Sequence, residues 1–169
     1  MKLVICEKPS VGAAVAAALG VTGKKDGYIE NDKYIISWCI GHLVQLSEAA
    51  AYGEQYRKWS YDSLPILPQE WQYTVAADKG KQFKILKDLM HRADVSEVVN
   101  ACDAGREGEL IFRFVYHQAG CKKPFTRLWI SSMETDAIRS GFEHLKDGRG
   151  YDTLYHSALC RAKADWLIG

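Results

Sequence analysis

Short apolar runs alternate along this chain with segments in which apolar residues recur every three or four positions. The runs at 2–7 (KLVICE) and 97–103 (EVVNACD) are largely apolar at consecutive positions, which is typical of strands buried on both faces. The segment at 125–131 (FTRLWIS) is predicted to be a third strand. Helical spacing predicts helices over 80–91, 106–118 and 135–146. This alternation predicts right-handed β-α-β crossovers and therefore an α/β fold, with helices flanking a mainly parallel sheet.

The first part of the chain carries signals for a helix and a hairpin. Ser10 is predicted to cap the helix that follows it, and Gly20 to end that helix. An N-terminal hairpin is predicted over 27–46, with Glu30–Asp32 as its turn and 34–40 as its second strand.

Residues 47–68 are rich in aromatic residues and proline, and are predicted to form a long excursion with little sheet before a strand at 71–75. Trp59 and Trp71 lie in or beside this excursion. Exposed tryptophans can stack on nucleic-acid bases, although packing that anchors the loop is the more ordinary role.

The last segment, 151–169, is predicted to be one helix, and its apolar face is formed by Leu154, Ala158, Ala162 and Trp166. This helix has no stop signal except Gly169 at the end of the chain. We therefore expect a domain over 1–150, followed at 151–169 by the start of a helical domain that is truncated here.

Composition narrows the class of protein. A length of 169 residues suits about one domain, and a net charge of +1 gives no strong overall field. A nucleic-acid partner would therefore have to be bound by local patches. The five cysteines are scattered, odd in number and without a C-x-x-C pair, which favours a reducing, cytoplasmic compartment over a disulfide framework or a zinc site. The sequence has no signal peptide or membrane span.

Acidic residues follow two of the predicted strands. Glu7 follows the first strand and Asp103 follows EVVNAC, and each comes directly after a cysteine. If these strands are neighbours, both side chains project into one crevice at the carboxyl edge of the sheet. Glu107, four residues after Asp103, can face the same space. Carboxylates this close repel one another, and a hard cation such as Mg²⁺, held by oxygen ligands and water, relieves the repulsion. Lys8 and Arg106, beside the acids at two helix N-termini, suit a phosphate.

A plainer interpretation stays open on spacing alone. Acids at a helix start complement the helix dipole, which explains Glu107 and Glu109 without a ligand. Asp103 is also an acceptable N-cap. The repeat of the pattern at Glu7, with Lys8 beside it, favours the metal site.

These residues resemble the toprim domain, the metal-binding module of type IA topoisomerases, bacterial primases and some nucleases. The resemblance rests on Glu7 and on the DAGREGE motif that contains Asp103 and Glu107. Further motifs resemble the N-terminal portion of bacterial topoisomerase III, in the order EKPS, GHL, DAGREGELIF, LWISSMETDAIRSGF and RAKADWLIG. The resemblance implies a Rossmann-like toprim fold, Mg²⁺ as cofactor, and single-stranded segments of supercoiled or catenated DNA as substrate.

The resemblance also implies roles for single residues. Glu7 matches a catalytic glutamate at the leaving 3′ oxygen that is also a possible metal ligand, and Lys8 matches a lysine beside the scissile phosphate. Asp103 and Glu107 match metal-ligand positions. Gly105 stands where the family pattern has a second aspartate, which favours one metal ion over two.

Three further residues are expected to face DNA or phosphate. Arg106 lies within the acidic motif, His42 lies in GHL, and Arg161 lies in the last helix. A lone histidine is more often structural, so the resemblance carries the expectation for His42.

The family cleaves DNA with a tyrosine that lies in another domain with a Tyr-Pro-Arg-type signature, and this chain has no such signature. The chain is therefore expected to supply the acid and metal half of an active site, to need the remaining domains of its polypeptide, and to be inactive alone in DNA relaxation. Two alternatives stay open. One is the toprim domain of a primase or Mg²⁺-dependent nuclease, and the other is a non-catalytic module that binds Mg²⁺ or phosphate.

Overall fold

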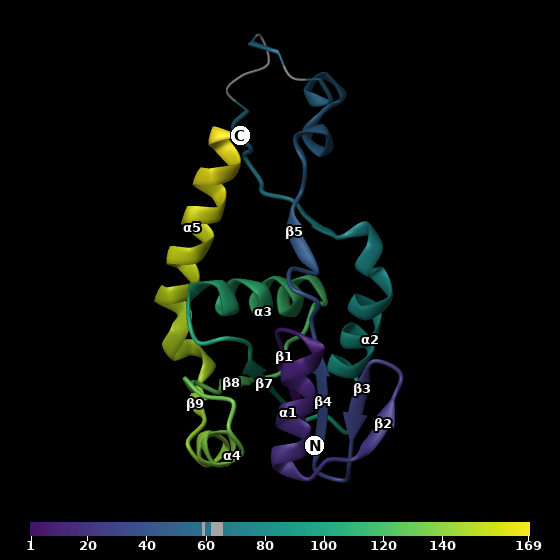
Figure 1. The fold of residues 1–169 in the computed structure, drawn as a ribbon. Helices are drawn as coiled ribbons and strands as arrows, with labels where there is room; N and C mark the ends of the chain where they lie inside the picture. The colour runs from purple at the N-terminus through teal and green to yellow at the C-terminus, as the bar shows by residue number, and fades with distance from the viewer. Residues whose placement is uncertain (59, 62–65) are drawn as a thin grey trace.

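A computed structural model describes residues 1–58, 60–61 and 66–169, and it has the predicted α/β architecture (Figure 1). The central sheet has seven strands in the order β2-β3-β4-β1-β7-β8-β9. The four inner strands run parallel: β4 (Tyr34–Trp38), β1 (Lys2–Cys6), β7 (Glu97–Ala101) and β8 (Phe125–Arg127). Three antiparallel strands lie at the edges: β2 (Gly23–Lys25), β3 (Tyr28–Glu30) and β9 (Lys146–Asp147).

Helices cover both faces of this sheet (Figure 1). They are α1 (Pro9–Leu19), α2 (Gly80–Met90), α3 (Arg106–Gln118), α4 (Thr135–Glu143) and α5 (Asp152–Ile168). Short 3₁₀ turns are η1 (Ala49–Tyr52), η2 (Glu54–Tyr56), η4 (Ala77–Lys79) and η5 (Gly148–Tyr151). Among the described residues, no helix combines the length and the apolar composition that crossing a membrane requires.

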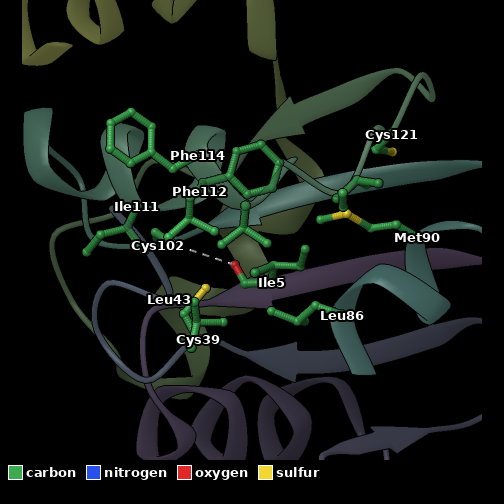
Figure 2. Close-up of a cluster of buried hydrophobic side chains, with 14 of the residues drawn as sticks. Ile5, Cys39, Leu43, Leu86, Met90, Cys102, Ile111, Phe112, Phe114 and Cys121 are labelled. Carbon is green, nitrogen blue, oxygen red and sulfur yellow. Dashed lines mark hydrogen bonds between the residues drawn. The ribbon is translucent and has the colours of Figure 1, made fainter. Parts of the chain in front are cut away.

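Alternation along β1 explains why its apolar residues are consecutive. Leu3 and Ile5 face a core formed with α2, α3 and α5, part of which Figure 2 shows. Val4 and Cys6 face a second core formed with α1 and α4. Because side chains of a strand alternate between faces, a strand buried on both faces must be apolar throughout.

The predicted N-cap of the first helix, Ser10, is wrong by two residues, whereas the helix predicted to begin at residue 135 does begin there. Helix α1 begins at Pro9 with Lys8 as its N-cap, because the fixed φ of proline suits the first helical position and its missing N–H needs no partner there. Helix α4 begins at Thr135, with the extended residue Glu134 as its N-cap. The hydroxyl of Ser132 accepts a hydrogen bond from the Glu134 N–H in the turn that precedes this helix.

Several predicted strands are shorter than expected. The hairpin of β3 and β4 is confirmed, but its turn begins at Asn31, whose side-chain oxygen accepts hydrogen bonds from the N–H groups of Lys33 and Tyr34. The second hairpin strand ends at Trp38, and the strand predicted over 125–131 ends at Arg127. The short edge strands β2 and β9 were not predicted from the sequence.

A second, two-stranded sheet extends from the body of the molecule. In it, β5 (Val44–Leu46) pairs antiparallel with β6 (Tyr73–Val75). We call residues 44–75 the arm. The described residues of 47–68 contain 3₁₀ turns and no strand, as predicted, and Trp59 lies outside the described residues.

Helix α5 packs against α3 and then runs out to the arm (Figure 1). Its predicted apolar face is confirmed, because Leu154, Ala158, Ala162 and Trp166 are all at least half-buried. The indole N–H of Trp166 donates to the Ser47 carbonyl (2.9 Å). Helix α5 and the arm therefore form one connected unit.

Candidate metal and nucleic-acid site

Glu7 and Asp103 lie side by side at the carboxyl edge of the sheet. Strands β1 and β7 are parallel neighbours in which Cys6 pairs with Ala101, so the residues that follow them leave the sheet together. The prediction of a shared crevice required these two strands to be neighbours, and they are. One Glu7 carboxylate oxygen is buried and has no hydrogen-bond partner among the described residues.

The surroundings of Glu7 favour its protonated form. Burial raises the pKa of this carboxyl, and the adjoining Asp103 side chain raises it further by contact and by charge. The Asp103 backbone and the charge of Lys8 act in the opposite direction. Lys8 itself is exposed at the N-cap of α1. If both carboxyls were ionised, their negative charges would repel each other, and a bound proton or cation would remove that repulsion.

Glu107 is directed elsewhere. It lies in the first turn of α3, and its carboxylate pairs with the His42 ring, which belongs to the loop between β4 and β5. The backbone carbonyl of His42 accepts a hydrogen bond from Lys79 (3.3 Å). Sequence reasoning brought His42 and Glu107 to the same region but did not anticipate that they are partners.

Among the described residues, no three His, Cys, Asp or Glu side chains are placed together as a set of metal ligands. The orphaned oxygen of Glu7 and the neighbouring carboxylate of Asp103 nonetheless fit Mg²⁺, which is usually held by one or two carboxylates and completed by water and substrate phosphate. Gly105, the N-cap of α3, has a φ of +150° and contributes no ligand oxygen from a side chain.

A groove runs from the start of α3 toward α5. It has a volume of about 650 Å³, and its charged or polar lining residues are His42, Arg106, Glu107, Arg161 and Asp165. All three residues that the sequence suggested for phosphate or DNA contact line this groove. They come from separate segments, since one is in a loop and the others are on α3 and α5.

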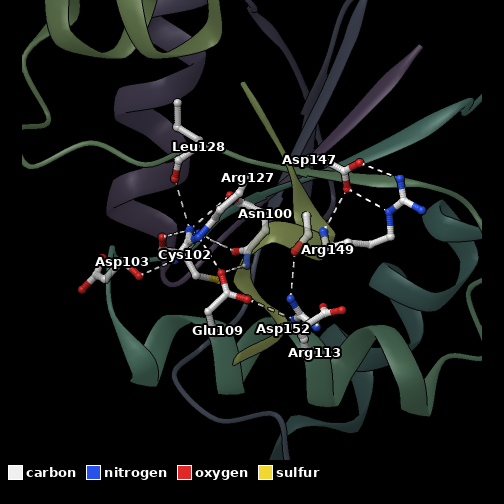
Figure 3. A network of polar contacts seen from close by, with 11 residues as sticks. Asn100, Cys102, Asp103, Glu109, Arg113, Arg127, Leu128, Asp147, Arg149 and Asp152 are labelled. Carbon is white, nitrogen blue, oxygen red and sulfur yellow. Dashed lines mark hydrogen bonds and ion pairs between the residues drawn. The ribbon is translucent and has the colours of Figure 1, made fainter. Parts of the chain in front are cut away.

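Beneath Asp103 lies a buried polar network that sequence reasoning missed (Figure 3). Its side chains are Asn100, Glu109, Arg113, Arg127 and Asp152. Glu109 pairs with Arg127 (2.7 Å) and with Arg113 (3.0 Å). Burial lowers the pKa of Arg127, and the charge of Glu109 opposes this.

Two signals in the sequence point to this network. Glu109 and Arg113 are four residues apart on the apolar face of α3, where a charged residue needs a partner. Arg127 is the one charged residue of the strand predicted over 125–131 (FTRLWIS). A charge at a core position predicts a buried ion pair, although the sequence does not identify its partner.

Trp71 packs on α5 and leaves little of its ring for a nucleic-acid base. Its ring meets Trp166 edge-on at 5.2 Å between centroids, and Lys163 lies over it at 5.3 Å. The structural role that we considered the more ordinary one is therefore confirmed for Trp71.

The chain matches the Toprim domain family over residues 2–133. It is 46% identical over 167 residues to DNA topoisomerase 3 of Bacillus subtilis and 48% identical over 168 residues to DNA topoisomerase 3 of Shouchella clausii. These alignments cover 99% of the chain, which spans only about a quarter of the length of each relative (23%).

The solved structure of full-length topoisomerase I from Thermotoga maritima has a similar fold. The TM-score is 0.66 at 19% identity, over 99% of this chain and 24% of that one. The family match covers most of the chain, and the fold and order of motifs agree with it. The chain therefore belongs to the toprim domain family and is similar, over nearly its whole length, to a part of DNA topoisomerase 3.

Proposed function

We propose that this chain is the acid and metal half of a type IA topoisomerase that cuts, passes and reseals single DNA strands, with Mg²⁺ as cofactor and without ATP. The nucleophilic tyrosine, which forms a 5′-phosphotyrosyl link, would lie in the remaining domains of the polypeptide. The observation that carries the proposal is the meeting of Glu7 and Asp103 at the carboxyl ends of two neighbouring parallel strands.

Glu7 is proposed as the general acid. A carboxyl whose pKa is raised holds its proton closer to neutral pH, which suits proton transfer in the working range. During cleavage Glu7 gives its proton to the leaving 3′ oxygen, and during resealing it takes that proton back. Lys8 stabilises the negative charge that develops at the phosphate.

Glu7, Asp103 and Glu107 are the proposed holders of Mg²⁺. When bound, the ion supplies positive charge that orients the phosphate and neutralises its oxygens. Glu107 would have to leave His42 to join the other two acids. Gly105 adds no carboxylate, which supports a single, weakly held ion before DNA binds.

The groove is proposed as the path of the DNA strand. Arg106 lies on α3 beside the acids, and Arg161 lies on the facing side of the groove on α5. His42 lines the same groove and would contact the same backbone. Phosphate contacts of this kind position a strand without reading its sequence.

Divalent-metal binding tests the metal half. Mn²⁺ or Mg²⁺ titration of the wild type is expected to reveal weak binding that Asp103→Ala abolishes. Asp26→Ala is the matched control, because Asp26 lies in the turn between β2 and β3, where it forms an exposed ion pair with Lys81, and β4 separates that turn from β1. Equal binding by the wild type and Asp103→Ala would contradict the metal assignment and favour a module in which the acids only cap a helix.

Activity of the whole polypeptide tests the reaction. A protein that contains this chain and the remaining domains should relax negatively supercoiled DNA with Mg²⁺ and without ATP. Glu7→Gln should stop relaxation, and the 169-residue chain alone should not relax DNA. Primer synthesis or strand degradation in place of relaxation would favour a primase or nuclease. The proposal also places the protein in the cytoplasm with the chromosomal DNA.

A further inference from the structure

The segment that carries Asp103 lies beyond the hydrogen-bond ladder of the sheet. The pairing of β7 with β1 ends at Ala101, and its pairing with β8 ends at Asn100. Among the strands that the structure describes, none therefore pairs with the carbonyl groups of Cys102 and Asp103. Something other than the sheet must hold this backbone if the Asp103 side chain is to keep one place.

Arg127, the last residue of β8, donates hydrogen bonds to the backbone just beyond the end of the ladder (Figure 3). Its Nη2 donates to the Asp103 carbonyl at 2.7 Å, and its Nη1 donates to the carbonyls of Cys102 and Asn100. Nη1 also donates to the Asn100 side-chain oxygen at 3.3 Å, and that oxygen accepts from the Cys102 N–H at 3.1 Å. A single guanidinium thus holds the backbone carbonyls of Asn100, Cys102 and Asp103.

A cation of this kind in the core needs an explanation. Arg127 is 0% exposed, and its charge is balanced by Glu109. A buried ion pair is weak evidence for stability, because apolar residues of similar volume often serve as well. An apolar side chain has no donors, however, and a lysine lacks the planar fork that reaches several carbonyls together. The hydrogen bonds of the guanidinium to the carbonyls of Asn100, Cys102 and Asp103 therefore explain why an arginine is buried here.

The same carbonyl is confined from the other side by α3. A Cβ atom on Gly108 would lie 2.0 Å from the Asp103 carbonyl oxygen, so the helix backbone meets this group directly. Arg127 and Gly108 therefore leave the Asp103 peptide very little freedom.

We propose that Arg127 is a positioning residue, which fixes the Cys102–Asp103 backbone and thereby sets the Asp103 carboxylate beside Glu7. Where it concerns metal, the inference rests on the proposed function. Partners that orient a metal ligand without touching the metal typically change affinity by about 10- to 100-fold. The fixed backbone is a property of the chain itself and is measurable without metal.

The experiment compares three substitutions in the full 169-residue chain. Arg127→Lys keeps the charge and loses the fork. Glu109→Gln keeps the shape of the side chain that holds the guanidinium and removes its charge. Leu89→Ala is the control, because Leu89 is a buried residue of α2, a helix that contributes no side chain to this network as described above, and its truncation destabilises the core.

The first readout is hydrogen exchange of the Cys102 and Leu128 amides, since both donate to Asn100. Arg127→Lys should speed exchange of both amides at least tenfold relative to the amides of β7, and Glu109→Gln should do so to a smaller extent. Leu89→Ala should leave that ratio unchanged. Unchanged ratios in Glu109→Gln and in folded Arg127→Lys would overturn the inference, and Glu109→Gln decides alone if Arg127→Lys does not fold.

The second readout is Mn²⁺ affinity by electron paramagnetic resonance, at a temperature where each variant is folded. We expect about a tenfold or greater rise in Kd for Arg127→Lys and none for Leu89→Ala. Wild-type affinity in Arg127→Lys would overturn the link from backbone to carboxylate. Absence of Mn²⁺ binding by the wild type would instead count against the proposed function, and amide exchange would still decide the role of Arg127.

Discussion

Glu109 and Arg113, one turn apart on α3, form an ion pair from which water is almost excluded, with side chains 1% and 6% exposed. Arg113 also pairs with Asp152 (2.6 Å) and donates to the Gly148 carbonyl (2.9 Å). Through these contacts the polar layer beneath the candidate site reaches the start of α5. The toprim body and α5 are thus joined by charge as well as by apolar packing.

Arg113→Met should therefore be strongly destabilising. It leaves part of the Glu109 charge and the Gly148 carbonyl without partners, and breaking a buried pair by removing one member costs about 3 kcal/mol or more. Chemical denaturation measures the loss. Arg149→Met is the matched control, because Arg149 and Asp147 form an ion pair with side chains 82% and 58% exposed. The control should lose much less stability, because an exposed ion pair contributes little, and equal losses would contradict the account.

Gly108→Ala should displace Asp103. The new Cβ would meet the carbonyl oxygen of Asp103 at 2.0 Å, and because that group is backbone, no rotamer change relieves the clash. We expect a loss of about 1–3 kcal/mol in unfolding free energy together with weaker Mn²⁺ binding. Gly80→Ala is the control, since a Cβ there meets no atom of the described residues within 4 Å and the backbone is helical. It should be neutral or stabilising by up to about 1 kcal/mol.

The parallel inner sheet was predictable because its central strands are buried on both faces. The consecutive apolar residues of β1 and β7 indicate this burial directly. The meeting of Glu7 and Asp103 followed from the same pattern once those strands proved to be neighbours. The edge strand β2 was not predictable in this way. It consists of the exposed residues Gly23–Lys25, and only its pairing with β3 makes it a strand.

Charged residues at core positions predict a buried ion pair, but the sequence does not identify which of them meet. Glu109 and Arg127 are 18 positions apart in the sequence but touch because α3 crosses the sheet over β8, and no local pattern encodes that contact. The pairing of His42 with Glu107 is equally non-local. The resemblance to the family supplied the residues of the site, whereas the structure supplies the partners that orient them.

Trp166→Phe should loosen the arm while leaving the central sheet intact. The substitution keeps an aromatic ring but removes the hydrogen bond to the Ser47 carbonyl. Ser47 in turn donates its own N–H to Gln72 across the arm (2.9 Å), so exchange of this amide should become faster. Amides of β1 should be unaffected. Leu167→Ala, at an exposed neighbouring position, is the control and should change neither set.

The stability of the metal-free protein should fall as pH rises through the titration of Glu7. The folded state holds this proton more tightly than the unfolded state, because burial and the Asp103 carboxylate raise the pKa of Glu7. Between the ordinary glutamate pKa of about 4.3 and the raised folded value, the folded state binds more protons, so each step upward in pH favours unfolding.

Asp103→Asn removes the neighbouring charge and should lower the pKa of Glu7, so the metal-free variant should exceed the wild type in stability at neutral pH. Carboxyl NMR titration of Glu7 and denaturation at several pH values measure the two effects. Mg²⁺ should stabilise the wild type at neutral pH but not the variant, because the ion offsets a repulsion that the variant lacks. A pKa of Glu7 that is unchanged by Asp103→Asn would show that burial alone sets it, and that the two acids do not act as a pair.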